Sequence, residues 1–235
     1  MTESMTEGKF FKTAGVIAAF IAIVGIGMVT SSRRVIAHDD DDDERDEARV
    51  RRGFEIAPVP LDLVGKNRHL VGLGSYIVNA QADCNGCHSK DPATEFAVGG
   101  NPYLRSPFFT GKEVINPATY LGGGRDFGPI GSVAHIISRN LTPDKTGRAE
   151  GGNTLAQFVH IIRTGTDSDH IHPNCTAPGT PPNCFQPPFN GDLLQVMPWP
   201  IHQNMTEHDL RAIYEYLSAV PCLEGGPGEP ANRCQ

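Results

Sequence analysis

The sequence has no excess of basic residues: 20 Lys and Arg stand against 27 Asp and Glu, a formal net charge of −7. Because nucleic-acid recognition requires a basic face, this balance argues against a nucleic-acid-binding protein. The chain also shows no internal repeat and no succession of strands and helices that would predict a parallel sheet. A repeat protein and a doubly wound fold are therefore not expected.

Glycine and proline, by contrast, are abundant, with 26 and 19 residues in a chain of 235. Apolar residues make up 39%, which is enough for one domain with a core. This composition predicts a small number of regular elements joined by long irregular connections.

The N-terminal part is predicted to lie outside this domain. Residues 13–30 form an uncharged run of 18 residues, which is long enough for a membrane anchor preceded by a cytoplasmic tail, residues 1–12. A signal peptide ending at residues 35–37 is the alternative, but Arg33 and Arg34 directly before that site argue against cleavage. The same two arginines lie on the far side of the run, so charge alone does not predict its orientation.

An acidic linker is predicted for residues 31–60. Eight of the fifteen residues from His38 to Arg52 are acidic, and charges of one sign at this density stay solvated. Residues 44–52 could be helical through acid–base pairs one turn apart. The stretch is read as a spacer, and a docking site for a basic partner or a divalent cation is the alternative.

Three helices are predicted in the folded domain, residues 61–235. Apolar spacing indicates helices over Leu63–Ala80 and Leu155–Thr164, and a third that Thr206 caps and Pro221 ends. Residues 132–138 fit either a helical turn or a short strand. The predicted fold is all-α with loop-rich insertions, preceded by one N-terminal transmembrane helix. Three short helices bury little surface, so a large apolar group such as a haem is expected to fill the centre.

The most specific motif is CNGCH, with Cys84, Cys87 and His88. Cys-x-x-Cys-His is the attachment signature of c-type haem: two thiols bond the porphyrin and the histidine becomes the proximal iron ligand. A zinc site would need a second ligand pair at similar spacing, which the chain lacks. A thioredoxin-like dithiol would need a βαβ context. One covalent haem c is therefore predicted, and its attachment outside the cytoplasmic membrane sets the domain in the periplasm.

The sixth iron ligand is less well defined by the residues alone. Met197 in QVMPWP is the candidate, because thioether sulfur is a soft ligand and two prolines constrain the segment. Gap-filling in the core is an equally good reading of a single methionine. The histidines that compete with it are His135, His160, His170, His172 and His202.

Several blocks in order carry a family resemblance: GSYIVNAQADCNGCHS, FAVGGNPY, SRNLTPDKTG, LAQFVHIIRTGTD, VMPWP and MTEHDLRAIYEYLSAVP. Over residues 63–221 the chain resembles class I cytochrome c domains of membrane-bound alcohol, aldehyde and sugar-acid dehydrogenase cytochrome subunits. The resemblance implies a cytochrome c fold, Met197 as iron ligand, and Asn140 and Thr142 as contacts at the haem edge. Those subunits usually carry three haem motifs, whereas this chain carries one.

A second departure from that family is the cysteine-containing stretch His170–Phe189. Cys175 and Cys184 are close in sequence, as are Cys222 and Cys234. Four cysteines permit three connectivities, and the two local pairings cost the least loop entropy. Two disulfides, Cys175–Cys184 and Cys222–Cys234, are predicted, in keeping with an oxidising compartment.

These features together predict a single-pass inner-membrane protein with a monohaem domain in the periplasm. Its expected role is that of an electron carrier rather than an enzyme, passing single electrons between respiratory or photosynthetic partners. Those partners would be a membrane redox complex, a dehydrogenase or oxidase subunit, or another cytochrome. A haem enzyme, or a gas or redox sensor with an open or His-ligated sixth position, is the alternative.

Overall fold

The computed structural model describes residues 46–129, 135–169, 172–177, 183–225 and 232–235. The predicted tail, the apolar run over residues 13–30 and the first part of the acidic linker lie outside these residues. Among the described residues, no helix combines the length and apolar character needed to span a bilayer. The compact unit considered below extends from Ala48 to Gln235.

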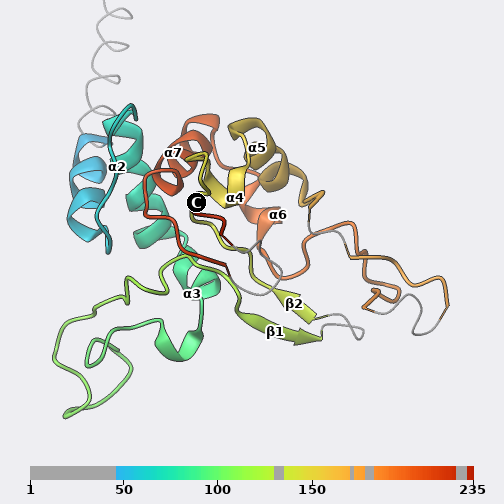
Figure 1. Cartoon of the computed structure of the whole chain (residues 1–235), viewed down its shortest axis with the longest axis horizontal. Helices are drawn as coiled ribbons and strands as arrows, with labels where there is room; N and C mark the ends of the chain where they lie inside the picture. Colours follow the sequence, from blue (N-terminus) through green and yellow to red (C-terminus); the bar gives the residue numbers. More distant parts are fainter. Residues whose placement is uncertain (1–45, 130–134, 170–171, 178–182, 226–231) are drawn as a thin grey trace, which may run out of the picture. The chain divides into compact units, whose positions relative to one another are not determined.

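The regular elements of this unit are short and separated by long connections (Figure 1). Residues 48–56 are helical. The helices that follow are α2 (Arg68–Tyr76), the π-helical η1 (Ile77–Gln81), α3 (Cys84–His88), the 3-10 helix η2 (Pro92–Thr94), α4 (Ala149–Gly152), α5 (Leu155–Thr164), α6 (Trp199–His202) and α7 (Glu207–Leu217), with the strands β1 (Asp126–Pro129) and β2 (His135–Ile137) between η2 and α4.

The all-α prediction is wrong, because the structure is mixed and contains strands as well as helices. β1 and β2 pair antiparallel, with Asp126 opposite Ile137 and Pro129 opposite His135. Part of the stretch 132–138, which the sequence left between helical turn and strand, thus forms β2. A three-residue strand shows no alternation of its own, and only its pairing with β1 stabilises it.

The first predicted helix is shorter than expected and changes character. It begins after Asn67, whose side chain accepts a hydrogen bond from the Leu70 amide at 3.2 Å. After Tyr76 the hydrogen bonds widen to the π pattern, as in the 2.9 Å bond from the Ala82 amide to the Ile77 carbonyl. π-turns within helices are frequent at functional sites, and this one leads the chain into the CNGCH motif.

The other two helices begin where the sequence predicts, but α7 ends at Leu217, before the predicted stop at Pro221. α5 begins with a capping box between Thr154 and Gln157 and ends at Gly165 in the left-handed conformation. α7 begins at Thr206, whose hydroxyl accepts from the Asp209 amide at 3.0 Å. Capping side chains determine where both helices begin, because they accept hydrogen bonds from amides that the first helical turn leaves unpaired.

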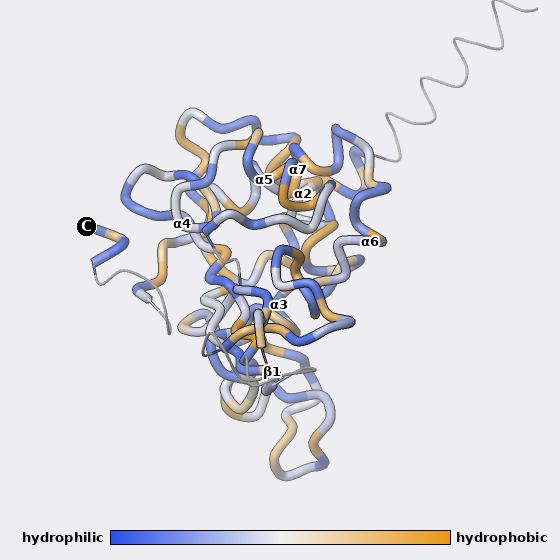
Figure 2. The backbone as a smooth tube through the Cα atoms, turned by 90° about the vertical axis from the view of Figure 1, so that its right-hand side faces the viewer, coloured by the Kyte–Doolittle hydropathy of each residue, from blue (hydrophilic) through white to orange (hydrophobic). Residues whose placement is uncertain are grey.

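The core forms where α2 and α7 cross. Gly74 allows the close approach, since a Cβ at this position would lie 1.9 Å from the Ala212 carbonyl oxygen. Leu73, Leu210 and Leu217 are fully buried around the crossing, where the tube in Figure 2 is largely hydrophobic. Gly74 of α2 therefore admits a neighbouring backbone.

The helix over residues 48–56 extends the packed unit into the stretch assigned to the linker. Val50 is buried, and Gly53 lies against Gly72 of α2. The Ser75 hydroxyl donates to the Gly53 carbonyl over 2.7 Å. The last residues of the acidic stretch are thus part of the fold.

Candidate functional site

The CNGCH motif forms the one-turn helix α3. Asp83 precedes it with φ 47° and ψ 47°, a left-handed conformation that turns the chain sharply out of η1. Gly86 fits beside this turn, because a Cβ there would lie 2.7 Å from the Asp83 carboxylate. The turn carries Cys84, Cys87 and His88 to one wall of a cavity.

His88 is oriented by a backbone carbonyl. Its Nδ1 lies 2.7 Å from the carbonyl oxygen of Arg139. A carbonyl only accepts hydrogen bonds, so Nδ1 carries the proton and Nε2 keeps its lone pair. Burial lowers the pKa of His88 below its usual value, which favours the neutral imidazole. This is the protonation state in which histidine binds a metal.

A glycine holds the two partners of this hydrogen bond together. The Gly123 amide donates to the His88 carbonyl at 2.7 Å. Gly123 has φ +64°, and a Cβ there would lie 2.3 Å from the Arg139 carbonyl carbon. Both its conformation and the space around it therefore require glycine.

The cavity beside α3 encloses about 1200 Å³ of empty space, part of which is open to solvent, and is lined mainly by apolar side chains. The β1–β2 hairpin, α5, the segment after Asn190 and α7 supply them: Phe127, Ile136, Ile137, Phe158, Ile161, Ile162, Leu194, Val196, Leu210, Ile213 and Leu217. Residues distant in sequence thus form one apolar chamber next to the two thiols and the imidazole. A flat apolar cofactor fits such a lining.

Met197 lines the same cavity as His88. Its segment is held in place by Trp199, whose amide donates to the Met197 carbonyl at 2.8 Å and whose indole donates to the Leu194 carbonyl at 3.1 Å. The indole packs over Gly165 at the end of α5, where a Cβ would come within 2.3 Å of the ring. The structure therefore brings the predicted sixth ligand to the cavity that holds the motif.

Two further sulfur or nitrogen donors reach this cavity, His202 of α6 and Met205. Partial burial lowers the pKa of His202, so its ring is neutral near pH 7. The sequence analysis treats His202 only as a competitor and misses Met205. No periodic signal marks the turn from α6 to α7 that places Met205 on the cavity wall.

The other histidines that compete for the sixth position do not line this cavity in the part of the chain that the structure describes. His135 pairs with Asp126 on the β hairpin at 2.7 Å, and His160 is exposed on α5. His172 packs edge-on against Phe185, with the ring centroids 5.1 Å apart. His170 lies outside the described residues.

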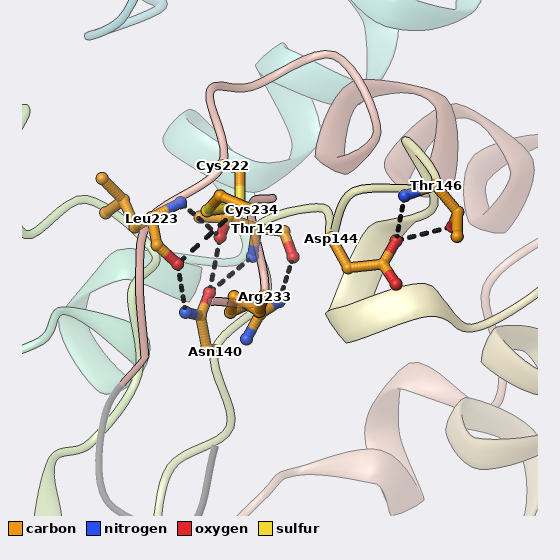
Figure 3. The surroundings of a disulfide bond; sticks show 8 residues. All are labelled: Asn140, Thr142, Asp144, Thr146, Cys222, Leu223, Arg233 and Cys234. Carbon is orange, nitrogen blue, oxygen red and sulfur yellow. Dashed lines mark hydrogen bonds between the residues drawn. A yellow bond between two sulfur atoms is a disulfide. The ribbon is translucent and has the colours of Figure 1, made fainter. Parts of the chain in front are cut away.

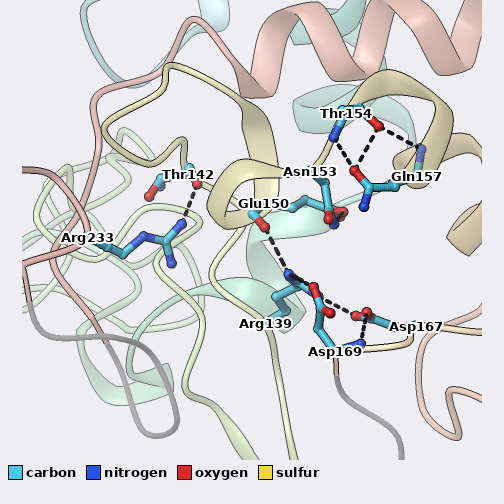
Figure 4. A network of polar contacts seen from close by, with 9 residues as sticks. All are labelled: Arg139, Thr142, Glu150, Asn153, Thr154, Gln157, Asp167, Asp169 and Arg233. Carbon is cyan, nitrogen blue, oxygen red and sulfur yellow. Dashed lines mark hydrogen bonds and ion pairs between the residues drawn. The ribbon is translucent and has the colours of Figure 1, made fainter.

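A charged cluster forms the polar part of the cavity wall (Figure 4). Arg139 pairs with Asp167 at 2.5 Å, and its guanidinium also donates to the Glu150 carbonyl at 3.0 Å. Asp167 and Glu150 are buried. The residue that orients His88 through its carbonyl is thus itself fixed through its side chain. Sequence analysis misses this pair, because the two residues are 28 positions apart with no local pattern.

Asn140 and Thr142 are almost completely buried but are not among the residues that line the cavity. The Asn140 side chain accepts from the Thr142 amide and hydroxyl and donates to the Leu223 carbonyl at 3.1 Å (Figure 3). Thr142 also accepts from the Leu223 amide at 3.0 Å. The two residues thus hold the C-terminal segment through Leu223, and their contact with a haem edge stays a prediction.

Both predicted disulfides are confirmed. Cys175 bonds Cys184, and Cys222 bonds Cys234 next to the Asn140–Thr142 network. Cys84 and Cys87 are the free cysteines. Burial, together with the negative charge of Asp83, raises the pKa of Cys84 to about 12. In redox-active dithiols the pKa of the reactive thiol is lowered. The raised pKa of Cys84 therefore argues against a thioredoxin-like role.

No cluster of three or more His, Cys, Asp or Glu side chains that could hold a metal ion occurs in the described part of the chain.

The chain matches no protein-family model, no characterised protein and no solved structure.

Proposed function

We propose that the chain is a monohaem c-type electron carrier. Cys84 and Cys87 would hold the haem covalently, and His88 and Met197 would bind its iron. A bound haem c would supply reversible one-electron chemistry. The observation that carries the proposal is the single cavity in which a CNGCH helix, a tautomer-fixed His88 and Met197 meet.

The cavity residues fit such a group. Apolar side chains from four parts of the chain exclude water, while Arg139 and its carboxylate partners supply fixed charge at one edge. The Arg139 carbonyl orients His88 and increases its basicity as a ligand. Two neutral ligands that both stay bound leave no open position for a substrate, which favours a carrier over an enzyme.

The proposed setting is the periplasmic face of the inner membrane, with residues 13–30 as a single-pass anchor. Tethering would raise the local concentration of a membrane redox complex, a dehydrogenase or oxidase subunit, or another cytochrome. The chain could equally be retained as a subunit of such a complex. Disulfides Cys175–Cys184 and Cys222–Cys234 agree with an oxidising compartment.

One specific observation supports a second candidate, a haem enzyme or a gas or redox sensor. His202 lines the same cavity as Met197, so it could serve as a sixth ligand or as an acid–base group beside an open position.

The deciding experiment compares Met197→Ala with His202→Ala in the haem-loaded full chain purified in detergent. For the carrier, Met197→Ala removes the weak red band of methionine-ligated ferric haem and lowers the reduction potential, because a ligand that stabilises ferrous iron is lost. His202→Ala leaves both unchanged. If the wild type lacks the band and binds added ligands readily, the enzyme or sensor replaces the carrier.

Cofactor attachment and partners need separate readouts. Replacing Cys84 and Cys87 by alanine is expected to abolish haem that survives denaturing electrophoresis, whereas Cys175→Ala with Cys184→Ala retains it. Purification without denaturation then separates a free shuttle from a subunit, since only the subunit retains its partners.

A further inference from the structure

Two tyrosines and an asparagine form a closed ring of hydrogen bonds close to the CNGCH motif. The Tyr120 hydroxyl lies 2.5 Å from Asn79 Oδ1 and 2.8 Å from the Tyr216 hydroxyl, and Asn79 Nδ2 lies 3.2 Å from the Tyr216 hydroxyl. An amide oxygen only accepts hydrogen bonds, so Tyr120 donates to Asn79, Tyr216 donates to Tyr120, and the Asn79 amide donates to Tyr216. Each hydroxyl of the ring therefore donates one hydrogen bond and accepts another.

The two tyrosines of this ring are sealed from solvent, with 1% of Tyr120 and 0% of Tyr216 exposed. Burial raises the pKa of both hydroxyls, so both keep the protons that the ring requires near neutral pH. A buried polar network holds its members rigidly when every member is paired, because a buried polar group without a partner is costly. Removal of one hydroxyl is therefore expected to disturb the whole ring.

The ring joins three parts of the chain that are distant in sequence. Asn79 belongs to the π-helical η1, Tyr216 belongs to α7, and Tyr120 lies in the connection before β1. The second hydrogen of the Asn79 amide goes to the Ser75 carbonyl at 2.9 Å, so the side chain is held on both sides. Asn79 is the central residue of η1, and π geometry is rare in proteins. Its two tyrosine partners therefore fix this turn from outside the helix.

The π-turn leads directly to the first thiol of the motif. Asn79 precedes Cys84 by five positions, and the chain reaches Cys84 through the left-handed Asp83. Cys84 packs against the core cluster that contains both tyrosines, and a negative charge on Cys84 would add to the effect of burial on the pKa of either hydroxyl. The Cys84 thiol thus lies near the ring, whereas Cys87 is exposed.

The segment that carries Tyr120 also bonds the motif through its backbone. The Leu121 amide donates to the Asn85 side chain at 2.9 Å, and the Gly123 amide donates to the His88 carbonyl. One short segment therefore holds the turn before the motif through a hydroxyl and the motif itself through two amides. The three ring residues do not line the cavity beside α3, so they act on the position of the motif rather than on a group in the cavity.

We propose that the ring of Asn79, Tyr120 and Tyr216 positions the Cys84 thiol for thioether formation. The inference rests on the proposed function, because it assumes a covalent haem. The bond forms when the thiol adds across a vinyl double bond: sulfur bonds one carbon and the thiol hydrogen passes to the other, so no oxidant or reductant is consumed. Misplacement of a reacting group by about 1 Å can slow a reaction about 100-fold, so a fixed turn before Cys84 favours the addition.

Mapping of free thiols in the haem-loaded full chain tests the inference. Protein from a host that attaches haem c is denatured and alkylated without reduction, so that only cysteines outside thioethers and disulfides react. Mass spectrometry of the haem-carrying peptide then assigns the label to Cys84 or Cys87. In Tyr120→Phe and in Tyr216→Phe, we expect the labelled fraction of Cys84 to rise about tenfold over the wild type, while Cys87 stays protected.

Tyr214→Phe is the matched control. It removes a hydroxyl from the same helix, α7, which donates to the Asn153 carbonyl at 2.8 Å and lies outside the ring. This variant should unfold more readily in urea, because it loses a hydrogen bond, yet leave Cys84 as protected as in the wild type. A purely structural role of the tyrosines would change urea unfolding without labelling Cys84 selectively.

The possible outcomes separate this inference from the proposed function. Protection of Cys84 in either ring variant, equal labelling of Cys84 and Cys87, or labelling of Tyr214→Phe to the same extent would overturn the positioning role. A wild type without covalent haem contradicts the proposed function, and this inference with it. A wild type with both thioethers, together with ring variants that resemble it, contradicts the positioning role alone.

Discussion

At the scale of single residues, the orientation of His88 depends on the Arg139 carbonyl and on the groups that hold Arg139 in place. Its Nδ1 bonds the Arg139 carbonyl, and the Arg139 guanidinium is held by Asp167. Arg139 and Asp167 are largely buried, with 14% and 5% of their side chains exposed. A buried charge that loses its partner is costly, so the ion pair fixes the backbone that fixes the imidazole.

Asp167→Asn is therefore expected to lower the free energy of unfolding by about 2 kcal/mol, because the buried guanidinium loses its closest counter-charge. A displaced carbonyl would also alter the basicity of His88, so the reduction potential of the haem-loaded protein should shift. Urea unfolding and redox titration measure the two effects.

The control is Asp169→Asn, whose carboxylate is 62% exposed and 3.8 Å from the same guanidinium. Exposed pairs contribute little, so this variant should resemble the wild type in both measurements. Equal effects of the two substitutions would contradict a positioning role for Asp167.

At the scale of elements, the crossing of α2 and α7 depends on Gly74, which has no side chain to hold the two helices apart. Gly74→Ala would place a methyl group 1.9 Å from the Ala212 carbonyl oxygen. The helices must separate to admit it, so we expect a loss of about 3 kcal/mol in the free energy of unfolding. Chemical denaturation followed by circular dichroism measures this loss.

Gly65→Ala provides the steric comparison for this prediction. Gly65 has φ +70° with open space around it, so the alanine costs only the left-handed conformation, about 1 kcal/mol. A cost at position 74 no greater than at position 65 would show that the crossing tolerates a wider separation of the helices.

The segment after α7 is held by a disulfide together with hydrogen bonds. Replacing Cys222 and Cys234 by serine is expected to destabilise the fold by about 3 kcal/mol, because a loop of this length is no longer closed in the unfolded chain. The Asn140 bond to Leu223 lies beside that disulfide (Figure 3). Asn140→Ala should then cost less in the disulfide-free protein than in the wild type, as a double-mutant cycle measures. Strictly additive costs would mean that the segment holds its place without the bond.

At the scale of the whole molecule, the acidic balance bears on encounter with a partner. Residues 53–235 have seventeen acidic against twelve basic residues. If the chain passes electrons to a partner with a basic docking patch, the bimolecular rate should fall by about tenfold between low and physiological salt, because screening weakens steering. Stopped-flow mixing with a candidate partner at several ionic strengths measures the slope. A rate that rises with salt would indicate an acidic partner instead.

Much of the site can be predicted from local sequence. The CNGCH motif is contiguous, so Cys84, Cys87 and His88 are singled out as candidates without knowledge of the fold. α5 is predicted from its apolar spacing, and α7 also because Thr206 satisfies an amide within its first turn. The two disulfides follow from the low entropy of closing short loops. Each of these features depends on residues close together in the chain.

The features that only the tertiary structure decided are contacts between residues that lie far apart in the sequence. The β1–β2 pairing, the Arg139–Asp167 ion pair and the hydrogen bonds from Asn140 and Thr142 to Leu223 leave no periodic trace in the sequence. The same holds for Met205 and His202, which reach the cavity wall beside Met197 only when α6 packs near α5. The sequence by itself determined the CNGCH motif and the local helix signals, because both are set over a few residues. Which side chains face that motif was decided by packing, since long-range contacts form only after the loops between them close.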